Sequence, residues 1–249
     1  MDGVKMRAAS ERGLVIEFGQ EINPAVNARV HGLAKKLVNE YPEVIQEVVP
    51  TYRSLLVYFD PLQISRAALT VKVEQCLRET AEEAVVHEAE RIYIPVCYDE
   101  EFGPDLSFVA SHNGLSEAEV VKIHTSKPYL VYMLGFTPGF PYLGGMDERI
   151  ATPRLTKPRT RIPAGSVGIA GSQTGFYPLE TPGGWQLIGR TPVKAFDPAA
   201  KTPFLLEAGV YLQFQAISRA EYEELAETVA AGRYEVRRDR VSLGGVSRA

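Results

Sequence analysis

Glycine is concentrated in one stretch of this chain. Eleven of the 21 glycines fall between residues 135 and 189, where short apolar runs such as 166–170 and 184–189 are separated by turn signals. Glycine adopts backbone conformations that other residues rarely reach, so it marks tight turns and close approaches of the backbone. Short strands at this spacing are typical of a closed or nearly closed β-barrel. The stretch therefore predicts a mainly-β region.

A different pattern precedes this stretch. The apolar run 14–18 predicts a first strand, and Asn23 followed by Pro24 predicts the N-cap and first position of a helix over 24–40. Residues 47–52 and 54–59 predict two strands, and Ser65 caps a second helix. The order β-α-β-β-α is typical of an α+β domain with helices on one face of an antiparallel sheet.

The two patterns meet at an acidic stretch, residues 82–90, which leads into an apolar strand over 91–97. We therefore predict an α+β N-terminal domain over residues 1–88 and a mainly-β domain over 89–249. Two short helices follow that strand, the second beginning at a capping box formed by Ser116 and Glu119. A second capping box, Ser218 and Glu221, predicts a late helix, and residues 234–236 predict a strand in the tail.

Composition argues against several classes of protein. The net charge is −4, with 27 Lys and Arg against 31 Asp and Glu mixed along the chain, so no positive field would attract nucleic acid. The apolar runs are far shorter than the roughly 20 residues that span a bilayer, and no secretory leader is recognisable, so we expect a cytoplasmic location without a membrane partner. Cys76 and Cys97 lack CxxC spacing, which predicts two buried thiols and no disulfide.

The sequence predicts no cofactor and no metal bound by this chain alone. The run from Gly165 to Gly175 resembles a phosphate loop, but it lacks the Lys-Ser/Thr pair of a P-loop and the strand-to-helix context of a dinucleotide site. We interpret these glycines as turn and close-approach positions. The histidines also lack the spacings of metal sites; they are His31, His87, His112 and His124.

A dense aromatic segment offers a candidate binding surface. Five aromatic residues lie among turn residues between positions 129 and 142, and two of them, Phe136 and Phe140, flank a Thr-Pro-Gly turn. A stiff turn that holds rings in place suits the wall of a pocket for a flat or apolar group. A packed corner of the barrel is the alternative.

Polar candidates follow in the next segments. Arg159 and Arg161 alternate on an extended, proline-stiffened strand, so we expect both guanidinium groups on one side, where they could bind a carboxylate or phosphate. A solvated edge strand with salt-bridged arginines is the alternative. Gln173 and Tyr177 supply polar side-chain ends shortly before Trp185, the only tryptophan.

His124 ends the helix that begins at Ser116, where the helix dipole favours the protonated imidazole. Its place just before the aromatic segment makes it the first choice for a side chain that transfers a proton or binds substrate. A purely structural histidine is the alternative, and the sequence leaves its charge state open.

Three blocks of this sequence resemble the family called allophanate hydrolase subunit 1: residues 135–143, 158–171 and 182–192. The resemblance implies a cyclophilin-like barrel in the C-terminal domain. It also implies two partners, a C subunit of related barrel type and a separate A subunit, which together complete the ATP-dependent opening of 5-oxoproline to glutamate. The family's pocket lies between the two barrels, which carries a binding role onto His124, Phe136, Phe140, Arg159, Gln173, Tyr177 and Trp185.

The chemistry fits this division of labour. Opening a lactam with ATP needs a phosphate cradle, an activated carbonyl and a positioned water. This chain shows no cradle, so we expect ATP and a divalent cation only at the level of the complex, and we predict half of a shared active site that is inactive alone. The predicted catalytic side chains are His124, Gln173 and Tyr177; the predicted substrate-binding side chains are Phe136, Phe140, Arg159, Arg161 and Trp185.

The sequence is also compatible with other functions. The same family resemblance admits a binding module that docks on a sporulation histidine kinase and blocks phosphotransfer. It also admits a hydrolase component that acts on allophanate or a related urea-derived amide. Prolyl isomerisation, suggested by the barrel alone, is the weakest hypothesis because a fold does not imply a function.

Overall fold

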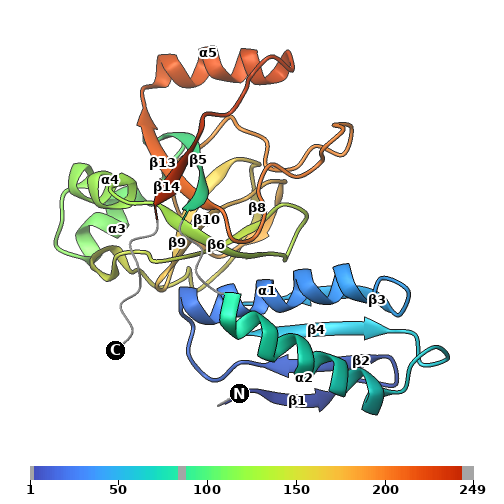
Figure 1. Cartoon of the computed structure of the whole chain (residues 1–249). Coiled ribbons are helices and arrows are strands. Elements are labelled where there is room, and N and C mark those ends of the chain that lie inside the picture. The colour runs from blue at the N-terminus through green and yellow to red at the C-terminus, as the bar shows by residue number, and fades with distance from the viewer. Residues whose placement is uncertain (1–2, 84–87, 243–249) are drawn as a thin grey trace. The chain divides into compact units, whose positions relative to one another are not determined.

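The computed structural model describes residues 3–83 and 88–242, and these two ranges form two compact units, called here unit 1 and unit 2 (Figure 1). Each unit has a hydrophobic core of its own. In the parts of the chain so described, no helix combines the length and the hydrophobicity needed to cross a membrane.

Unit 1 is an antiparallel sheet with two helices. The sheet has the order β1-β2-β4-β3, with β1 at Lys5–Ala8, β2 at Gly13–Glu17, β4 at Ser54–Phe59 and β3 at Ile45–Pro50. The helices are α1 at Pro24–Glu40 and α2 at Arg66–Glu83, and they contact each other. Alternate residues of β2 and β4 are buried in one core together with apolar residues of both helices, so the helices cover one face of the sheet.

The predicted architecture of unit 1 is confirmed, with one addition. The Asn23 side chain accepts a hydrogen bond from the Val26 N–H at 2.9 Å, and α1 has the predicted bounds. Ser65 likewise accepts from the Ala68 N–H at 3.2 Å at the start of α2. The strand β1 was not predicted, because its sequence Lys-Met-Arg-Ala is mostly exposed and has no buried face.

Unit 2 is built around a curled sheet of eight described strands. Their order is β10-β9-β12-β5-β13-β6-β7, with β14 also paired to β5, and the β5–β13 pair is the parallel one. At the two ends of this order, a Cβ added to Gly175 of β10 would lie 3.0 Å from the carbonyl oxygen of Pro141 in β7, so the sheet nearly closes on itself. The strands are β5 Glu88–Cys97, β6 Tyr129–Leu134, β7 Pro141–Gly144, β9 Ser166–Ala170, β10 Gln173–Phe176, β12 Gln186–Arg190, β13 Tyr211–Ile217 and β14 Arg238–Ser242.

The remaining elements of unit 2 surround this sheet. Two strands, β8 at Arg159–Ile162 and β11 at Thr181–Gly183, pair separately from it. The helices are α3 Leu106–His112, α4 Glu117–Thr125, the short 3-10 turn η1 Glu148–Ile150 and α5 Arg219–Ala230. Capping boxes begin α4 and α5 at Ser116 and Ser218, as predicted. The mainly-β, nearly closed architecture confirms the predicted fold class.

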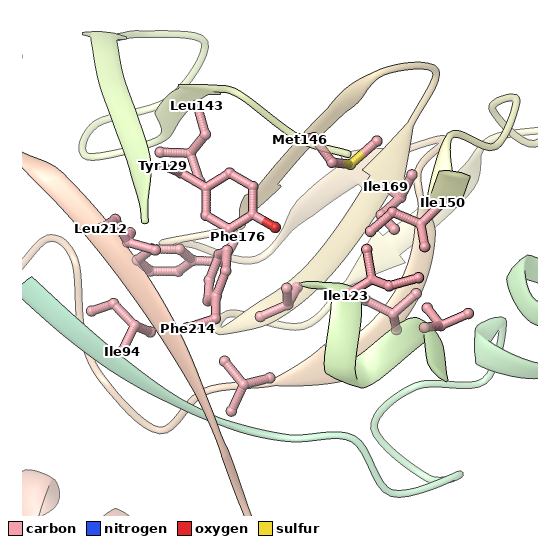
Figure 2. Packing of buried hydrophobic residues seen from close by; sticks show 14 of the residues in the cluster. Ile94, Ile123, Tyr129, Leu143, Met146, Ile150, Ile169, Phe176, Leu212 and Phe214 are labelled. Carbon is pink, nitrogen blue, oxygen red and sulfur yellow. The ribbon is translucent and has the colours of Figure 1, made fainter. Parts of the chain in front are cut away.

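The core of unit 2 joins residues from the sheet and from α4. Figure 2 shows Tyr129 of β6, Phe176 of β10 and Phe214 of β13 packed together, with Ile123 of α4 near them. All four side chains are buried. Both cysteines are buried thiols that form no disulfide, as predicted, and burial raises the pKa of each thiol.

Two boundary predictions in unit 2 are wrong. Residues 234–236 are irregular, and the tail strand is β14, which pairs with β5. Its arginine-rich sequence hides it, because ion pairs across the two strands, Arg238 with Glu90 and Asp239 with Arg91, replace the apolar alternation of a typical strand. For the same reason β5 begins at Glu88, inside the acidic stretch, and not at residue 91 as predicted.

Candidate functional site

Three aromatic rings of unit 2 form a tight cluster. The Phe140 ring lies edge-on to Tyr177 and to Trp185, at 5.5 Å between ring centroids in each case, and Tyr177 and Trp185 lie 6.1 Å apart. All three side chains are at most 6% exposed. We call these three residues the aromatic cluster; its burial matches the packed corner more closely than an open pocket wall.

Phe136 lies beside this cluster but faces solvent. Its ring contacts Phe140 at 5.5 Å between centroids, and the residue is 63% exposed. Its φ is +62°, and the Thr137 N–H donates to the Gly135 carbonyl at 2.7 Å, so Phe136 is the centre of a strained γ-turn of the rare positive-φ kind. A bulky residue in this conformation costs free energy, and such strain gathers at functional sites.

The loop around Phe136 is closed by further backbone bonds. The Phe140 N–H donates to the Thr137 carbonyl at 3.0 Å, and the Gly135 N–H donates to the Phe140 carbonyl at 3.1 Å. The buried Thr137 hydroxyl has no hydrogen-bond partner among the described residues. The loop between β6 and β7 therefore holds one exposed ring on a stiff support.

The two predicted arginines are held by different carboxylates. Arg159 is half-buried, and its Nη2 donates to Asp105 Oδ1 at 2.8 Å. Arg161 is exposed and pairs with Glu180 at 2.7 Å. The structure therefore does not join the two guanidinium groups in one fork, and Arg161 has the environment of the salt-bridged edge strand.

Asp105 is a central residue that the sequence patterns do not single out. Besides holding Arg159, its Oδ2 accepts a hydrogen bond from the Leu187 N–H at 2.7 Å. The Nη1 of Arg159 in turn approaches the carbonyl oxygen of Trp185 at 3.4 Å. Asp105 thus ties β8 and β12 to the start of α3 and fixes the guanidinium of Arg159 next to the aromatic cluster.

Tyr177 has a hydroxyl in a charged environment although its ring is buried. Burial raises the pKa of Tyr177 to about 12. The positive charges of Arg154 and Arg159 and a hydrogen bond with the backbone of Trp185 act in the opposite direction. Gln173, at the start of β10, is half-buried.

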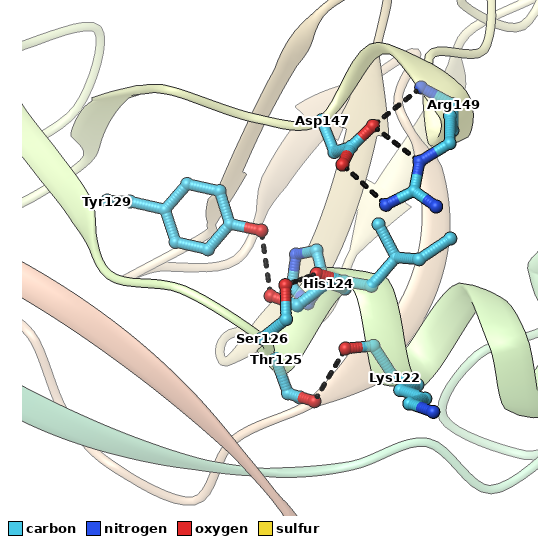
Figure 3. Close-up of polar contacts among 8 residues, drawn as sticks. Lys122, His124, Thr125, Ser126, Tyr129, Asp147 and Arg149 are labelled. Carbon is cyan, nitrogen blue, oxygen red and sulfur yellow. Dashed lines mark hydrogen bonds and ion pairs between the residues drawn. The ribbon is translucent and has the colours of Figure 1, made fainter.

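His124 is fully buried, and both of its ring nitrogens are hydrogen-bonded. Nε2 lies 2.8 Å from Thr174 Oγ1, and Nδ1 lies 2.7 Å from the Tyr98 hydroxyl. The Thr174 hydroxyl donates its single proton to the Gly168 carbonyl at 3.0 Å, so Nε2 must donate and Nδ1 must accept. Figure 3 shows the Tyr129 hydroxyl directed at the His124 carbonyl, which it reaches at 2.7 Å.

The charge state of His124, which the sequence leaves open, is decided by burial and not by the helix dipole. Loss of hydration on burial lowers the pKa of His124 from 6.5 to about 3, so the imidazole is neutral at physiological pH. The ring also stacks on Phe214, with ring centroids 4.5 Å apart, and burial is the cause of its lowered pKa. The histidine joins α4 to β10 and to Tyr98, the residue that follows β5, inside the core.

The structure brings together five of the predicted site residues by direct contacts. A chain of ring and hydrogen-bond contacts runs from Phe136 through the aromatic cluster to Arg159. His124 is linked to β10, the strand of Gln173, through Thr174. Arg161 lies outside this set, with Glu180 as its partner.

The glycine-rich run forms a hairpin and not a phosphate loop. Residues 165–175 fold into β9 and β10, in which Gly168 pairs with Gly175 and Ala170 with Gln173, so the backbone groups are engaged in the ladder. A Cβ added to Gly168 would lie 2.9 Å from the Gln186 carbonyl oxygen, which is the predicted close approach. Among the described residues, no three His, Cys, Asp or Glu side chains are grouped so that they could hold a metal ion.

Comparison with known proteins shows similarity over most of the chain. Residues 4–206 match the family described as carboxyltransferase domain, subdomain C and D. The B subunit of 5-oxoprolinase from Bacillus subtilis is 49% identical over 228 residues, which cover 87% of this chain and 94% of that protein. The protein of the same name from Escherichia coli O157:H7 is 43% identical over 204 residues, 82% of this chain and 92% of that protein.

A solved structure extends the comparison to the fold. The crystal structure of TTHA0988 superposes with a TM-score of 0.74 at 38% sequence identity, covering 83% of this chain and 40% of that longer chain. The sequence matches span all three blocks on which the predicted resemblance rests, and they confirm it.

Proposed function

Since the chain belongs to the carboxyltransferase domain family, subdomain C and D, we propose that it is the B subunit of a 5-oxoprolinase. That enzyme opens 5-oxo-L-proline to L-glutamate at the expense of ATP. The observation that carries the proposal is the nearly full-length similarity to two proteins that bear this name.

The geometry supports a half-site that a partner completes. The strained, exposed Phe136 and the half-buried Arg159 lie at opposite ends of one continuous set of contacts. The glycine-rich run is a hairpin and offers no phosphate cradle, so in this proposal the A and C subunits provide the ATP chemistry and the second wall of the pocket. The chain alone is then inactive.

Within this half-site we propose one role for each side chain. Arg159, oriented by Asp105, donates to the carboxylate of the substrate, and Gln173 and Tyr177 donate hydrogen bonds to its polar atoms. Phe136 covers the apolar part of the ring and excludes water. His124 is neutral and bonded at both nitrogens, so its proposed role is to position β10 and not to transfer a proton.

A reconstitution assay tests the proposal. Purified A, B and C subunits are mixed with 5-oxoproline and ATP, and glutamate is measured with each of the three omitted in turn. We expect glutamate only when this chain is present, and none from this chain with ATP alone. A heat-denatured sample of the chain is the control. Glutamate production that continues without this chain would refute the proposal.

Two alternative functions remain: hydrolysis of a urea-derived amide and docking on a histidine kinase. Allophanate in place of 5-oxoproline, in the same reconstituted mixture, tests the urea-amide hypothesis, and we expect 5-oxoproline to be the better substrate. Docking on a histidine kinase stays a prediction, because no contact or surface of the described residues favours it.

A further inference from the structure

Arg154 has a backbone that is fixed on both sides. The Leu155 N–H donates to the Gly184 carbonyl at 2.7 Å, and the Gln186 side-chain amide donates to the Pro153 carbonyl at 2.9 Å. These two bonds hold the segment 153–155 against the segment 184–186, whose middle residue is Trp185. An arginine between two such attachments starts from a well-defined position.

Arg159 reaches the same three-residue segment from the next strand. Its Nη1 lies 3.4 Å from the Trp185 carbonyl, while Asp105 holds its Nη2. The hydroxyl of Tyr177 lies close by, since a Cβ added to Gly183 would overlap it. The positive charges of Arg154 and Arg159 both act on that hydroxyl. The backbone around Arg154, the Arg159 guanidinium and the Tyr177 hydroxyl therefore all lie beside residues 183–186, at the start of β12.

The positive charge at this place is not balanced. In the segment 154–159, Arg154, Lys157 and Arg159 carry positive charge, and Asp105 is the one carboxylate that the described contacts bring to them. Arg154 is exposed, and none of the described residues forms an ion pair or hydrogen bond with its side chain. Since Asp105 already neutralises Arg159, Arg154 supplies the net charge that an anion would meet.

We propose that Arg154 binds the carboxylate of a small organic acid, at a site that it forms with Arg159 and the Tyr177 hydroxyl. Asp105 holds the Arg159 guanidinium in place as a preorganised donor, whereas Arg154 is free to close on the ligand with its forked N–H groups. The inference rests on the proposed function, in which the organic acid is 5-oxoproline, and it replaces Arg161 by Arg154 as the second arginine of the site.

Steady-state kinetics of the reconstituted complex test this site. Removing a charge-assisted hydrogen bond in R154Q should raise the KM for 5-oxoproline about ten- to hundredfold while kcat stays within about twofold. R154K, which keeps the charge but not the fork, should lie between R154Q and the wild type. The matched control is R149Q, an exposed arginine of unit 2 that is paired with Asp147, and its KM should not change. A KM in R154Q equal to that of the wild type, in an active complex, would overturn the inference and leave the proposed function standing.

A second readout separates the two claims. If the wild-type complex makes no glutamate, the proposed function fails, and the inference is judged on the chain alone by fluorescence of Trp185, its single tryptophan. Titration with 5-oxoproline should then change the emission saturably, and R154Q should need at least about ten times more ligand. No saturable change in the wild type, or the same curve for both proteins, would refute the site.

Discussion

His124 ends α4 inside the core of unit 2, where two effects on its charge oppose each other. The carbonyl end of a helix stabilises a cation by at most about 2 kcal/mol, and transfer of an unpaired cation into the interior costs more than that. The Tyr98 and Thr174 hydroxyls satisfy the neutral ring and offer no negative charge. Burial therefore decides the charge state, which the neighbouring sequence alone could not reveal.

The depressed pKa of His124 predicts a loss of stability in mild acid. The pKa is about 3 in the folded chain and 6.5 in the unfolded one, so between these values the unfolded state binds the extra proton. The stabilisation is complete above pH 6.5 and falls as the pH is lowered towards 3, by about 2 kcal/mol at pH 5.

Urea unfolding followed by Trp185 fluorescence at pH 7 and pH 5 measures this effect. The wild type should lose about 2 kcal/mol more than H124Q between the two values. The exposed His112 provides the control, and H112Q should behave as the wild type does. Equal pH dependence of the wild type and H124Q would contradict the assignment.

Asp105 is predicted to matter for stability as well as for the site. In D105A the Arg159 guanidinium and the Leu187 N–H both lose their acceptor, so the free energy of unfolding should fall by about 2 to 4 kcal/mol. E180A removes the exposed partner of Arg161 and should cost less than about 1 kcal/mol. Chemical unfolding of both variants measures these losses. Equal losses of unfolding free energy in D105A and E180A would show that the bonds of Asp105 do not stabilise the fold more than an exposed ion pair does.

At the scale of elements, the β9–β10 hairpin depends on its glycines in two different ways. Gly165, just before β9, has a φ of +82°, and a Cβ there would overlap the carbonyl oxygen of Thr191. Gly171, in the turn between the strands, has a φ of +59° but open space around it. Of these two glycines, only Gly165 is also close to another backbone segment, so a side chain there would meet both an overlap and the strain of a positive φ.

Alanine at these two glycines should have unequal effects. G171A introduces only the strain of the left-handed backbone and should cost about 1 to 2 kcal/mol. G165A must also displace the backbone of Thr191, and we expect at least about 3 kcal/mol. The urea midpoints of the two variants give the test. A loss of stability in G165A no larger than that in G171A would show that the backbone at Thr191 moves away from residue 165 at little cost in free energy.

The elements also show which features a sequence can reveal. Asn23-Pro24 and the two capping boxes are local signals, so they predicted α1, α4 and α5 well. The strands β1 and β14 were missed or misplaced because cross-strand pairing, not an apolar face, places these polar segments in their sheets. Among the candidate site residues, Phe140, Tyr177 and Trp185 each lie next to the end of a strand, and their rings contact one another.

The sequence patterns did not point to Asp105 or Arg154, for one shared reason. Bonds to residues far away in the sequence place Asp105 next to Leu187 and the backbone around Arg154, the residue proposed here, next to the neighbours of Trp185. Arg161 shares the alternation of Arg159, but Glu180 pairs with it. Spacing along one strand predicted that Arg159 and Arg161 act together, whereas the structure pairs the two arginines with different carboxylates.

For the whole molecule, the proposed half-site places the exposed Phe136 at the pocket edge that the C subunit closes, so we expect it to contribute to assembly, besides covering the substrate, and not to folding. The ring is exposed, so F136A should change the free energy of unfolding by less than about 0.5 kcal/mol. If the ring is an anchor for the C subunit, the same change should weaken association at least about tenfold.

Sedimentation of this chain mixed with the C subunit measures that association. Phe108 of α3 is the matched control, since it is also an exposed phenylalanine, and F108A should associate with wild-type affinity. Equal association of F136A and F108A would remove Phe136 from the interface.

The pairing of β5 with β14 joins the first and the last described strand of unit 2, with Glu88 opposite Ser242. The polypeptide thus enters and leaves this unit at one spot, and a short connector could seal it into a ring without breaking a ladder. New termini opened between the exposed loop residues Lys201 and Thr202 should yield a circularly permuted module that still folds. The same closeness allows a much longer polypeptide to carry the barrel as an insert.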